Sequence, residues 1–315
     1  MFRHRMRQSH PVLRRFLKKE RIAQMNYVIF DLEWNQPMSA SETVKEPLYL
    51  SGEIIEIGAV KLDEQFRLRD ELKLYIKPQY YTRMNDRVVA LTGIKNQHLA
   101  AKGVPFPEAF DRFLDWCGED FAFMTWSMSD IPMLADNMLL HGIDASELPV
   151  CYDIQRIFGR EIMRSEVRYS LDYALEILQE KGDTAHDALH DARNTAKICD
   201  RLDLNEYLEE YGSKVFAEAP RSRVYESCGE LLADAELREF TCPWCGETVT
   251  CEDFLQSGNG TYMAYGLCAE EDEFLLQLSA VKHQPGEYRA KRLLFEMSDD
   301  LWDIYMDKKE AAERQ

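Results

Sequence analysis

The strongest constraint on the fold of this chain is a change of hydrophobic pattern within residues 26–204. Three apolar segments with strand character come first, at residues 26–34, 53–63 and 72–78. Segments with helical spacing then alternate with short apolar runs up to about residue 204. Consecutive strands followed by such an alternation are typical of a mixed α/β sheet covered by helices. We therefore expect one α/β domain over residues 26–204.

The individual elements of this domain follow from the same periodicity. Helical spacing predicts helices over residues 106–118, 130–142, 170–182 and 187–203. Apolar runs predict a fourth strand over residues 121–127 and a short strand leading into a helix over residues 149–159. Ser170 is a suitable N-cap for the third helix, and Gly142 marks the end of the second.

The composition changes on either side of this domain. Residues 1–25 are rich in Arg and Lys, although the chain has a net charge of −18. This basic extension could be a nucleic-acid arm, a poor mimic of a transit peptide or a docked helix, or Met25 could be the natural start. Residues 205–239 indicate an acidic helical linker. Residues 240–296 contain short strands with more Thr, Gly, Tyr and Cys, and predict a small β-rich module. A C-terminal helix and tail follow over residues 297–315.

Charge and hydropathy limit the classes of function. A hydrophobic content of 45% is enough for a sizeable core. The net charge argues against coating of long nucleic acid through Lys and Arg, although bound metal ions could supply local positive charge. No apolar run approaches the roughly 18 residues of a membrane span, and no secretory signal follows the basic start. We expect a cytoplasmic protein without a membrane partner, in which eight cysteines serve as thiols or metal ligands.

Asp31 and Glu33 form the first candidate site, within the apolar segment YVIFDLEW. Because successive strand residues alternate faces, both carboxylates point the same way and Leu32 points to the other face. At ~5 Å and an effective dielectric constant near ~20, two such charges repel by roughly 3 kcal/mol. A divalent cation would remove that repulsion, and oxygen ligands suit Mg²⁺ or Mn²⁺.

Three further polar residues each have an ordinary structural explanation when taken alone. Asp130 could cap a helix, Asp191 could be a helix-surface charge, and His186 could be a buried or capping histidine. The spacing places His186 at a helix entrance and Asp191 on the first turns of that helix. His190 lies one turn after His186, as in some zinc helices, but Asp187 stands where a zinc protease has glutamate. We interpret His190 as a helix-surface residue.

Together these segments resemble the three motifs of the DEDDh group of DnaQ-like 3′–5′ exonucleases, which have an RNase H-like fold. Asp31 and Glu33 in DLE match the first motif, and Asp130 in WSMSD matches the second. His186 and Asp191 in AHDALHDARNTA match the third. GEIIEIGAV, LTGIKNQHL and GVPFPEAF are further similar to the subgroup of sporulation-inhibitor-like bacterial exonucleases and eukaryotic enzymes that trim small or histone-message RNAs. The resemblance covers about residues 26–204 and implies an RNase H-like mixed sheet flanked by helices.

The resemblance also implies a mechanism and a substrate. Two Mg²⁺ or Mn²⁺ ions would be held by Asp31, Glu33, Asp130 and Asp191. His186 would take the proton from the attacking water, a role that suits a side chain titrating near neutral pH. The substrate would be the 3′ end of single-stranded RNA or DNA, and the product a 5′ mononucleotide.

The T-G-I segment of the family lies near the terminal nucleotide of the substrate. Candidate contacts are Leu91, Thr92, Gly93 and Ile94. Trp34 could stack on a base, and Trp126 is a weaker candidate for the same role. Trp34 and Ile94 are equally consistent with core residues, because stacking and core packing use the same residue types.

The cysteines of the C-terminal module suggest a zinc ribbon. Cys242-Pro-Trp-Cys245-Gly resembles one zinc knuckle. The second knuckle would be supplied by Cys268, but Glu271 stands where its second cysteine is expected. Further residues that could complete the ligand set are Cys228, Cys251 and His283. A zinc site and a metal-free module both remain open, whereas a redox motif lacks its usual strand–helix context. Three other cysteines have apolar surroundings and predict small core residues: Cys117, Cys151 and Cys199.

Three functions are therefore compared. A 3′–5′ exonuclease explains all four carboxylates and the histidine. The alternative is a regulatory protein-interaction module on an exonuclease fold, in which the acidic C-terminal module contacts a protein partner. A zinc-ribbon nucleic-acid adaptor is disfavoured by the incomplete cysteine set and the net charge. RNA and DNA are not distinguished, because that choice depends on contacts to the 2′-hydroxyl group.

Overall fold

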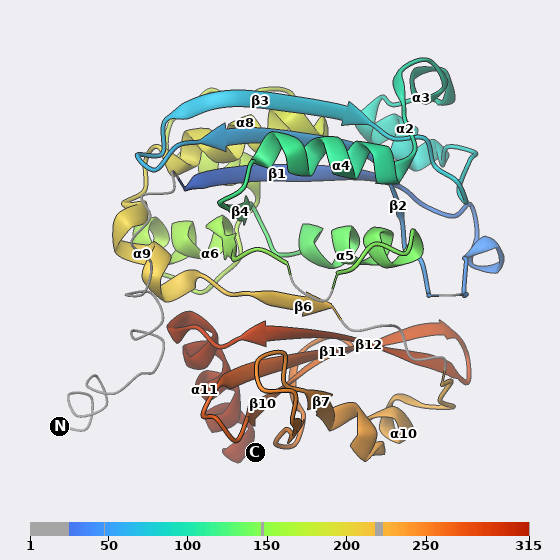
Figure 1. The fold of residues 1–315 in the computed structure, drawn as a ribbon, viewed down its shortest axis with the longest axis vertical. Helices are drawn as coiled ribbons and strands as arrows, with labels where there is room; N and C mark the ends of the chain where they lie inside the picture. Colours follow the sequence, from blue (N-terminus) through green and yellow to red (C-terminus); the bar gives the residue numbers. More distant parts are fainter. Residues whose placement is uncertain (1–24, 47, 146–147, 218–222, 315) are drawn as a thin grey trace.

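Two sheets, one above the other, organise the molecule (Figure 1). The computed structural model describes residues 25–46, 48–145, 148–217 and 223–314. Residues 1–24, most of the predicted basic extension, therefore lie outside the described residues. The first sheet has the strand order β3-β2-β1-β4-β5, and the second has the order β6-β12-β11-β10-β9.

The first sheet confirms the predicted mixed α/β fold. Its antiparallel strands are β1 (Asn26–Asn35), β2 (Glu53–Leu62) and β3 (Leu68–Tyr75). The two strands that continue the sheet in parallel are β4 (Phe121–Thr125) and β5 (Cys151–Asp153). The predicted consecutive strands form the antiparallel half, and the segments that alternate with helices form the parallel half.

Helices cover both faces of this sheet. The longer ones are α4 (Phe106–Cys117), α5 (Asp130–Leu140) and α8 (Ala188–Cys199). The shorter ones are α2 (Asp86–Thr92), α3 (Asn96–Lys102), α6 (Ile154–Phe158), α7 (Leu171–Ile177) and α9 (Leu204–Tyr211). Two helical turns, Ala40–Glu42 and Gly159–Met163, complete this region. Ser170 caps α7 as predicted, because its side chain accepts the N–H of Tyr173.

The alternation of β1 divides the core between the two faces of the sheet. Val28, Phe30 and Leu32 share a core cluster with residues of α4 and α5. Ile29 points the other way, into a cluster with residues of α6, α7 and α8. Figure 1 shows α4 and α8 on opposite sides of the sheet. Asp31 and Glu33, in register with Ile29, therefore face the side of α8.

The second sheet draws one strand from the predicted linker. β6 (Val215–Ala217) lies within residues 205–239 and pairs with β12 (Glu287–Glu296). The remaining strands of this sheet are β9 (Leu255–Gly258), β10 (Thr261–Leu267) and β11 (Glu273–Gln284). A separate ribbon consists of β7 (Glu239–Thr241) and β8 (Thr248–Thr250). The helical elements are α10 (Cys228–Ala233), the turn Ala235–Arg238 and α11 (Asp299–Glu313).

The two sheets share a continuous apolar core beside α5. The cluster that contains Phe30 also includes Val215 and Phe295 of the second sheet. Ion pairs reinforce this contact: Arg156 lies 2.7 Å from Asp300, and Lys291 pairs with Asp136 of α5. The C-terminal module is therefore packed directly on the first domain.

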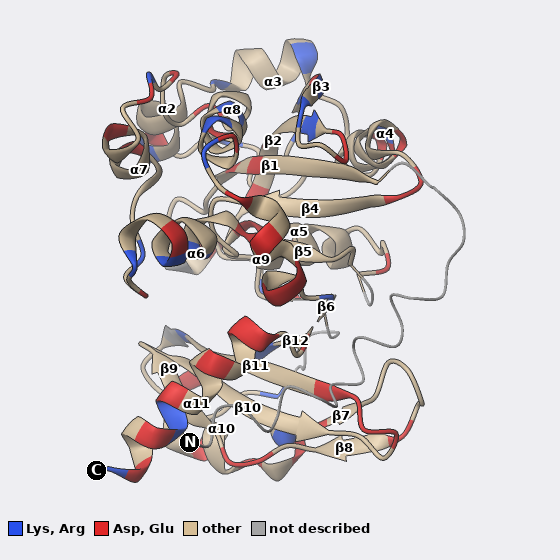
Figure 2. Cartoon of the chain, turned by 90° about the vertical axis from the view of Figure 1, so that its left-hand side faces the viewer, with Lys and Arg blue, Asp and Glu red and all other residues tan. Residues whose placement is uncertain are grey.

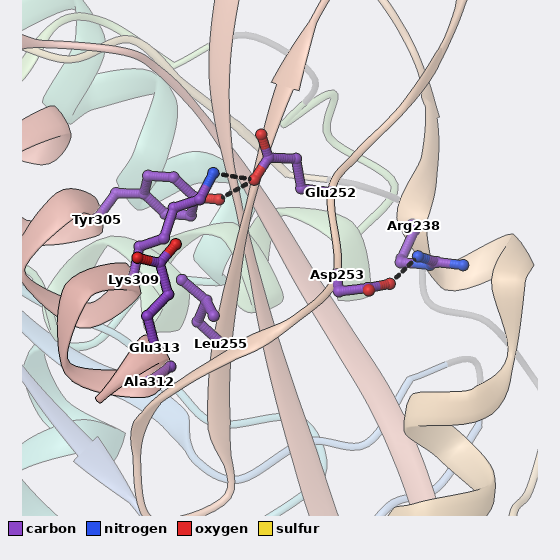
Figure 3. A pocket seen from close by; sticks show the side chains of 8 residues that line it. All are labelled: Arg238, Glu252, Asp253, Leu255, Tyr305, Lys309, Ala312 and Glu313. Atoms are coloured by element: carbon purple, nitrogen blue, oxygen red, sulfur yellow. Dashed lines mark hydrogen bonds and ion pairs between the residues drawn. The ribbon is translucent and has the colours of Figure 1, made fainter. Parts of the chain in front are cut away.

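The terminal helix α11 is anchored at a shallow cavity of about 630 Å³ (Figure 3). The Tyr305 hydroxyl and the Lys309 ammonium of α11 both donate to Glu252, at 2.7 Å and 2.6 Å. Arg238 pairs with Asp253 on the same rim. These charges satisfy one another and hold α11 against the module. Asp and Glu lie on both domains, including α9 and α11 (Figure 2). Within the described residues, no helix has the length and apolar character needed to cross a bilayer.

Candidate active site

β1 presents Asp31 and Glu33 on the face of the sheet covered by α8. In the register with β2, Asp31 lies opposite Gly58 and Glu33 lies opposite Glu56. The register shifts between Glu33 and Trp34, which marks a local irregularity at the end of the site. Both carboxylates are partly buried.

Asp130 reaches the same place from the first residue of α5. The residue is 6% exposed, and its side chain accepts the N–H of Leu32 at 3.2 Å. The N-cap of α5 is Ser129, whose side chain makes no capping bond, and Asp130 is the first helical residue, so Asp130 is not the helix cap that its position alone suggested. Because β4 runs parallel to β1 and leads to α5, Asp130 arrives beside Asp31.

His186 and Asp191 come from the entrance of α8. Asp187 is the N-cap of the helix, and Asp191 lies in its first turn. His186 has a positive φ of 63°, and its backbone N–H donates to Asp191 Oδ2 at 3.0 Å. This turn fixes the histidine and the aspartate relative to each other. His186 is exposed to solvent.

Three residues of the sheet hold this end of α8 in place. An ideal Cβ added to Gly58 would lie 2.0 Å from the backbone nitrogen of Leu189, so only glycine permits this close approach. Glu56, on the same strand, accepts the N–H of Ala188 at 2.9 Å. Lys73 of β3 lies 3.1 Å from Glu56 Oε1 and also pairs with Asp187.

The five residues named from the sequence all line one cavity of about 320 Å³. Its lining consists of Asp31, Leu32, Glu33, Trp34, Gln36, Arg87, Val88, Leu91, Thr92, Trp126, Ser127, Ser129, Asp130, His186 and Asp191. Ligand atoms of Glu33, His186 and Asp191 all lie within 4.8 Å of one another. The elements β1, α5 and α8 therefore bring together side chains that are far apart in the sequence.

The proposed substrate contacts divide into two groups. Trp34, Leu91 and Thr92 line the cavity, and Leu91 is 55% exposed. Gly93 and Ile94 do not line the cavity. Gly93 ends α2 with a φ of 72°, and Ile94 is 4% exposed in a core cluster around Ile55. Ile94 is therefore a core residue, which was the alternative explanation given from the sequence.

The electrostatics of the cavity favour a cation. Burial, reinforced by the neighbouring acids, raises the pKa of Asp31 well above its ordinary range. The same causes raise the pKa of Glu33 to about 8. Burial raises the pKa of Asp130 to about 7, although the Leu32 N–H opposes this shift. Carboxyl groups that resist ionisation together are suited to a divalent cation, which would stabilise their charged form. The set fits the hard oxygen donors that Mg²⁺ and Mn²⁺ prefer.

Several cavity residues were not anticipated from the sequence: Gln36, Arg87, Ser127 and Ser129. Arg87 is exposed in α2, a helix missing from the prediction. Its capping signals were present, because Asn85 accepts the Arg87 N–H and Gly93 ends the helix. His190 lies outside the cavity lining, and its Nδ1 is 3.2 Å from the Thr184 carbonyl oxygen.

The cysteines of the C-terminal module also converge in part. The Sγ atoms of Cys242, Cys245 and Cys268 all lie within 4.8 Å of one another. Cys228 and Cys251 are not in this group among the described residues, and the side chain of His283 lies outside the description. Cys117, Cys151 and Cys199 are buried, as expected of core residues.

Comparison with known proteins gives a family match over the first domain. Residues 28–199 match the RNase_T family, described as exonuclease. No curated protein matches the chain. Solved structures with similarity include the nuclease domain of 3′hExo, a DEDDh family member bound to rAMP (22% identity, 57% of this chain and 92% of that chain, TM-score 0.47). They also include cell-death related nuclease 4, CRN-4, at 22% identity, with 58% of this chain and 64% of that chain covered and a TM-score of 0.48. E. coli exonuclease I in complex with a dA16 oligonucleotide matches at 12% identity, with 77% of this chain covered and a TM-score of 0.48. The match covers 55% of that chain, about half the length of exonuclease I.

The family match extends over more than half of the 315 residues and contains all five residues of the cavity that were named from the sequence. The chain therefore belongs to the RNase_T exonuclease family and carries the DEDDh pattern of its DnaQ-like members.

Proposed function

We propose that this chain is a metal-dependent 3′–5′ exonuclease that hydrolyses single-stranded RNA or DNA to 5′ mononucleotides. The observation that carries the proposal is the convergence of four carboxylates and one histidine on a single cavity. A protein-interaction module would not need this set, so the complete site favours catalysis over the regulatory alternative.

Asp31, Glu33, Asp130 and Asp191 are the residues that would hold two Mg²⁺ or Mn²⁺ ions. When bound, such ions stabilise the attacking and departing oxygens of a phosphodiester. Asp31 lies at the centre of this set, because the charges of Asp130, Asp191 and Glu33 all raise the pKa of its carboxyl group.

His186 is the group that would accept a proton from the attacking water. Its side chain is exposed on the cavity, and its backbone is tied to Asp191. The ring can thus face a substrate while the turn around it stays fixed. The free 3′ end would lie against Trp34, Leu91 and Thr92, with Arg87 near its phosphates.

Incubation of the purified chain with 5′-labelled RNA and DNA oligomers tests this proposal. With Mg²⁺ or Mn²⁺ we expect a ladder that shortens from the 3′ end, no cleavage in EDTA, and a block by a 3′ phosphate. Asp31→Asn should remove cleavage, and His186→Ala should lower the rate by about 10²–10⁴. His190→Ala, in α8 but outside the cavity lining, is the matched control and should keep the parental rate. Cleavage by Asp31→Asn at the parental rate would refute the proposal.

A further inference from the structure

The C-terminal module contains a cluster of three cysteine side chains, formed by two hairpin loops. It is separate from the cavity lined by Asp31, Glu33, Asp130 and Asp191, which we call the carboxylate cavity. The loop between β7 and β8 supplies Cys242 and Cys245, and the loop between β10 and β11 supplies Cys268. The three sulfur atoms lie within 4.8 Å of one another, and Cys242 and Cys268 are buried. The described cysteines lie in thiol form, so a disulfide does not explain this convergence.

Both loops direct backbone N–H groups at a cysteine sulfur. In the first loop, the N–H groups of Trp244 and Cys245 point to the Cys242 sulfur. In the second, the Asp272 N–H donates to Cys268 Sγ at 3.3 Å, and the Glu270 N–H also points to it. Outer hydrogen bonds of this kind orient the side chains that ligate a metal ion. Two loops from separate hairpins therefore share this hydrogen-bonding pattern at a cysteine sulfur.

The second loop is a shortened copy of the first. Gly246, with a φ of 78°, donates its N–H to the Cys242 carbonyl at 2.9 Å, four positions after that cysteine. Glu271, with a φ of 65°, donates to the Cys268 carbonyl at 3.1 Å, only three positions after it. The loop after Cys268 is therefore one residue shorter than the loop after Cys242, and Glu271 stands at the spacing that Cys245 has from Cys242.

Asp272 ends this shorter loop, where its carbonyl accepts the Cys268 N–H at 3.0 Å. Its carboxylate is not in the group of ligand atoms that lie within 4.8 Å of one another, but its Oδ2 lies 3.5 Å from Cys268 Sγ. Tetrahedral zinc with Zn–S bonds of about 2.3 Å places its ligand atoms about 3.8 Å apart. Because no separation of these three sulfur atoms exceeds 4.8 Å, a contraction of at most about 1 Å would meet this geometry.

We propose that Cys242, Cys245 and Cys268 bind one Zn²⁺ ion, with the Asp272 carboxylate as the fourth ligand. Thiolate ligands select zinc over the hard cations of the carboxylate cavity. The ion would tie the β7–β8 ribbon to the β10–β11 hairpin. Each strand of that ribbon has three residues, and an isolated ribbon of this size is marginal in water. This inference is independent of the proposed exonuclease activity.

The test uses the full chain, purified in reductant without a metal-affinity tag. Elemental analysis should find about one zinc ion per chain, also in an Asp31→Asn background that disables the carboxylate cavity. After exchange of zinc for Co²⁺, the absorption spectrum should show intense thiolate-to-cobalt charge-transfer bands. Absence of zinc together with absence of these bands after reconstitution would overturn the proposal. The cobalt spectrum needs no variant, so it remains decisive if a cysteine substitution prevents folding.

Matched variants identify the ligands. Cys268→Ser should lose the metal, whereas Cys228→Ser should keep it, because Cys228 Sγ instead contacts the Tyr262 hydroxyl at 3.2 Å. Asp272→Asn should keep the charge-transfer bands but alter the cobalt d–d bands. If Cys251→Ser alters these bands and Asp272→Asn does not, the fourth ligand is Cys251 and the assignment to Asp272 is overturned. Retention of metal by Cys268→Ser at the parental level would overturn the whole site.

Discussion

Replacement of Lys73 by methionine should destabilise the fold and the site together. The Lys73 ammonium lies 3.1 Å from Glu56 and also pairs with Asp187, the N-cap of α8. The Glu56 side chain is only 1% exposed, and burial already raises its pKa. Methionine preserves much of the apolar stem of lysine but removes the charge. The variant therefore leaves a buried carboxylate without its cation.

The expected cost follows from that burial. Breaking a buried ion pair by removing one partner typically costs about 3–5 kcal/mol. Protonation of Glu56 limits the loss in the free energy of unfolding, because it removes the buried charge. This protonation costs less free energy at lower pH. Since the variant raises the folded-state pKa of Glu56 further, its free energy of unfolding should fall as pH rises. We expect a loss of about 3 kcal/mol or more at pH ~8 and a smaller loss at pH ~5.5.

Chemical denaturation of the variants at both pH values measures this cost. The double variant Lys73→Met/Glu56→Gln should recover part of the stability, because the unpaired charge is then gone. Arg193→Met is the matched control: the Arg193–Glu71 pair also joins α8 to β3, but its side chains are 35% and 31% exposed. It should cost less than about 1 kcal/mol. A loss from Lys73→Met no larger than that of Arg193→Met, with no pH dependence, would refute the reasoning.

Further predictions concern the cavity and its supports. Gly58→Ala should lower kcat by about 10²-fold or prevent folding, as measured by oligomer cleavage and circular dichroism, because the added Cβ would meet the backbone of α8. Arg87→Ala should raise KM for an oligonucleotide about tenfold with little change in kcat, and steady-state assays at several salt concentrations check this. In EDTA, the free energy of unfolding should fall as pH rises towards about 8, by up to about 1.4 kcal/mol per pH unit from Glu33 alone. The folded state keeps a proton on Glu33 in that range, whereas the unfolded state has lost it. Mg²⁺ should reduce this slope, and a flat profile in EDTA would contradict the raised pKa.

The parts of the fold that the sequence predicted are those with a repeated pattern. β1 and β2 are continuous apolar strands of ten residues, and α4 and α8 each run for twelve. Their periodicity is long enough to distinguish a strand from a helix. α2 and α3 have seven residues each, and β6 has three, which is too short for the period alone to identify them. α7 is as short as α2, but its helical spacing continues through residues 170–182 of the sequence. β6 is also held by pairing with β12, a partner far along the chain.

The same distinction applies to the site. The carboxylates of β1 were predictable because strand alternation alone sets their common face. The supports of α8 were not, because the contacts of Gly58, Glu56 and Lys73 depend on how the helix crosses the sheet. A glycine and a Glu–Lys pair on adjacent strands have no local signature. The register of β1, β2 and β3 creates their roles.

The placement of Lys73 shows how the fold supports an acidic site without neutralising it. Lys73, Glu56 and Asp187 are absent from the described residues that line the cavity. An ammonium group inside the cavity would occupy the position of a metal ion and lower its affinity by charge repulsion. Beneath the helix, the same group compensates Glu56 and the cap of α8, and among the described residues no Lys or Arg forms an ion pair with a cavity carboxylate. Burial, and after it the charges of Glu56, Asp191 and Asp130, raises the pKa of Glu33 to about 8, and a divalent cation would relieve both causes. On this argument, Lys73→Met should lower the cleavage rate because the catalytic residues lose their positions, whereas Glu33→Gln should lower it because a charged metal ligand is lost. Titration with Mn²⁺ separates the two, because the affinity for Mn²⁺ should fall strongly in Glu33→Gln and much less in Lys73→Met.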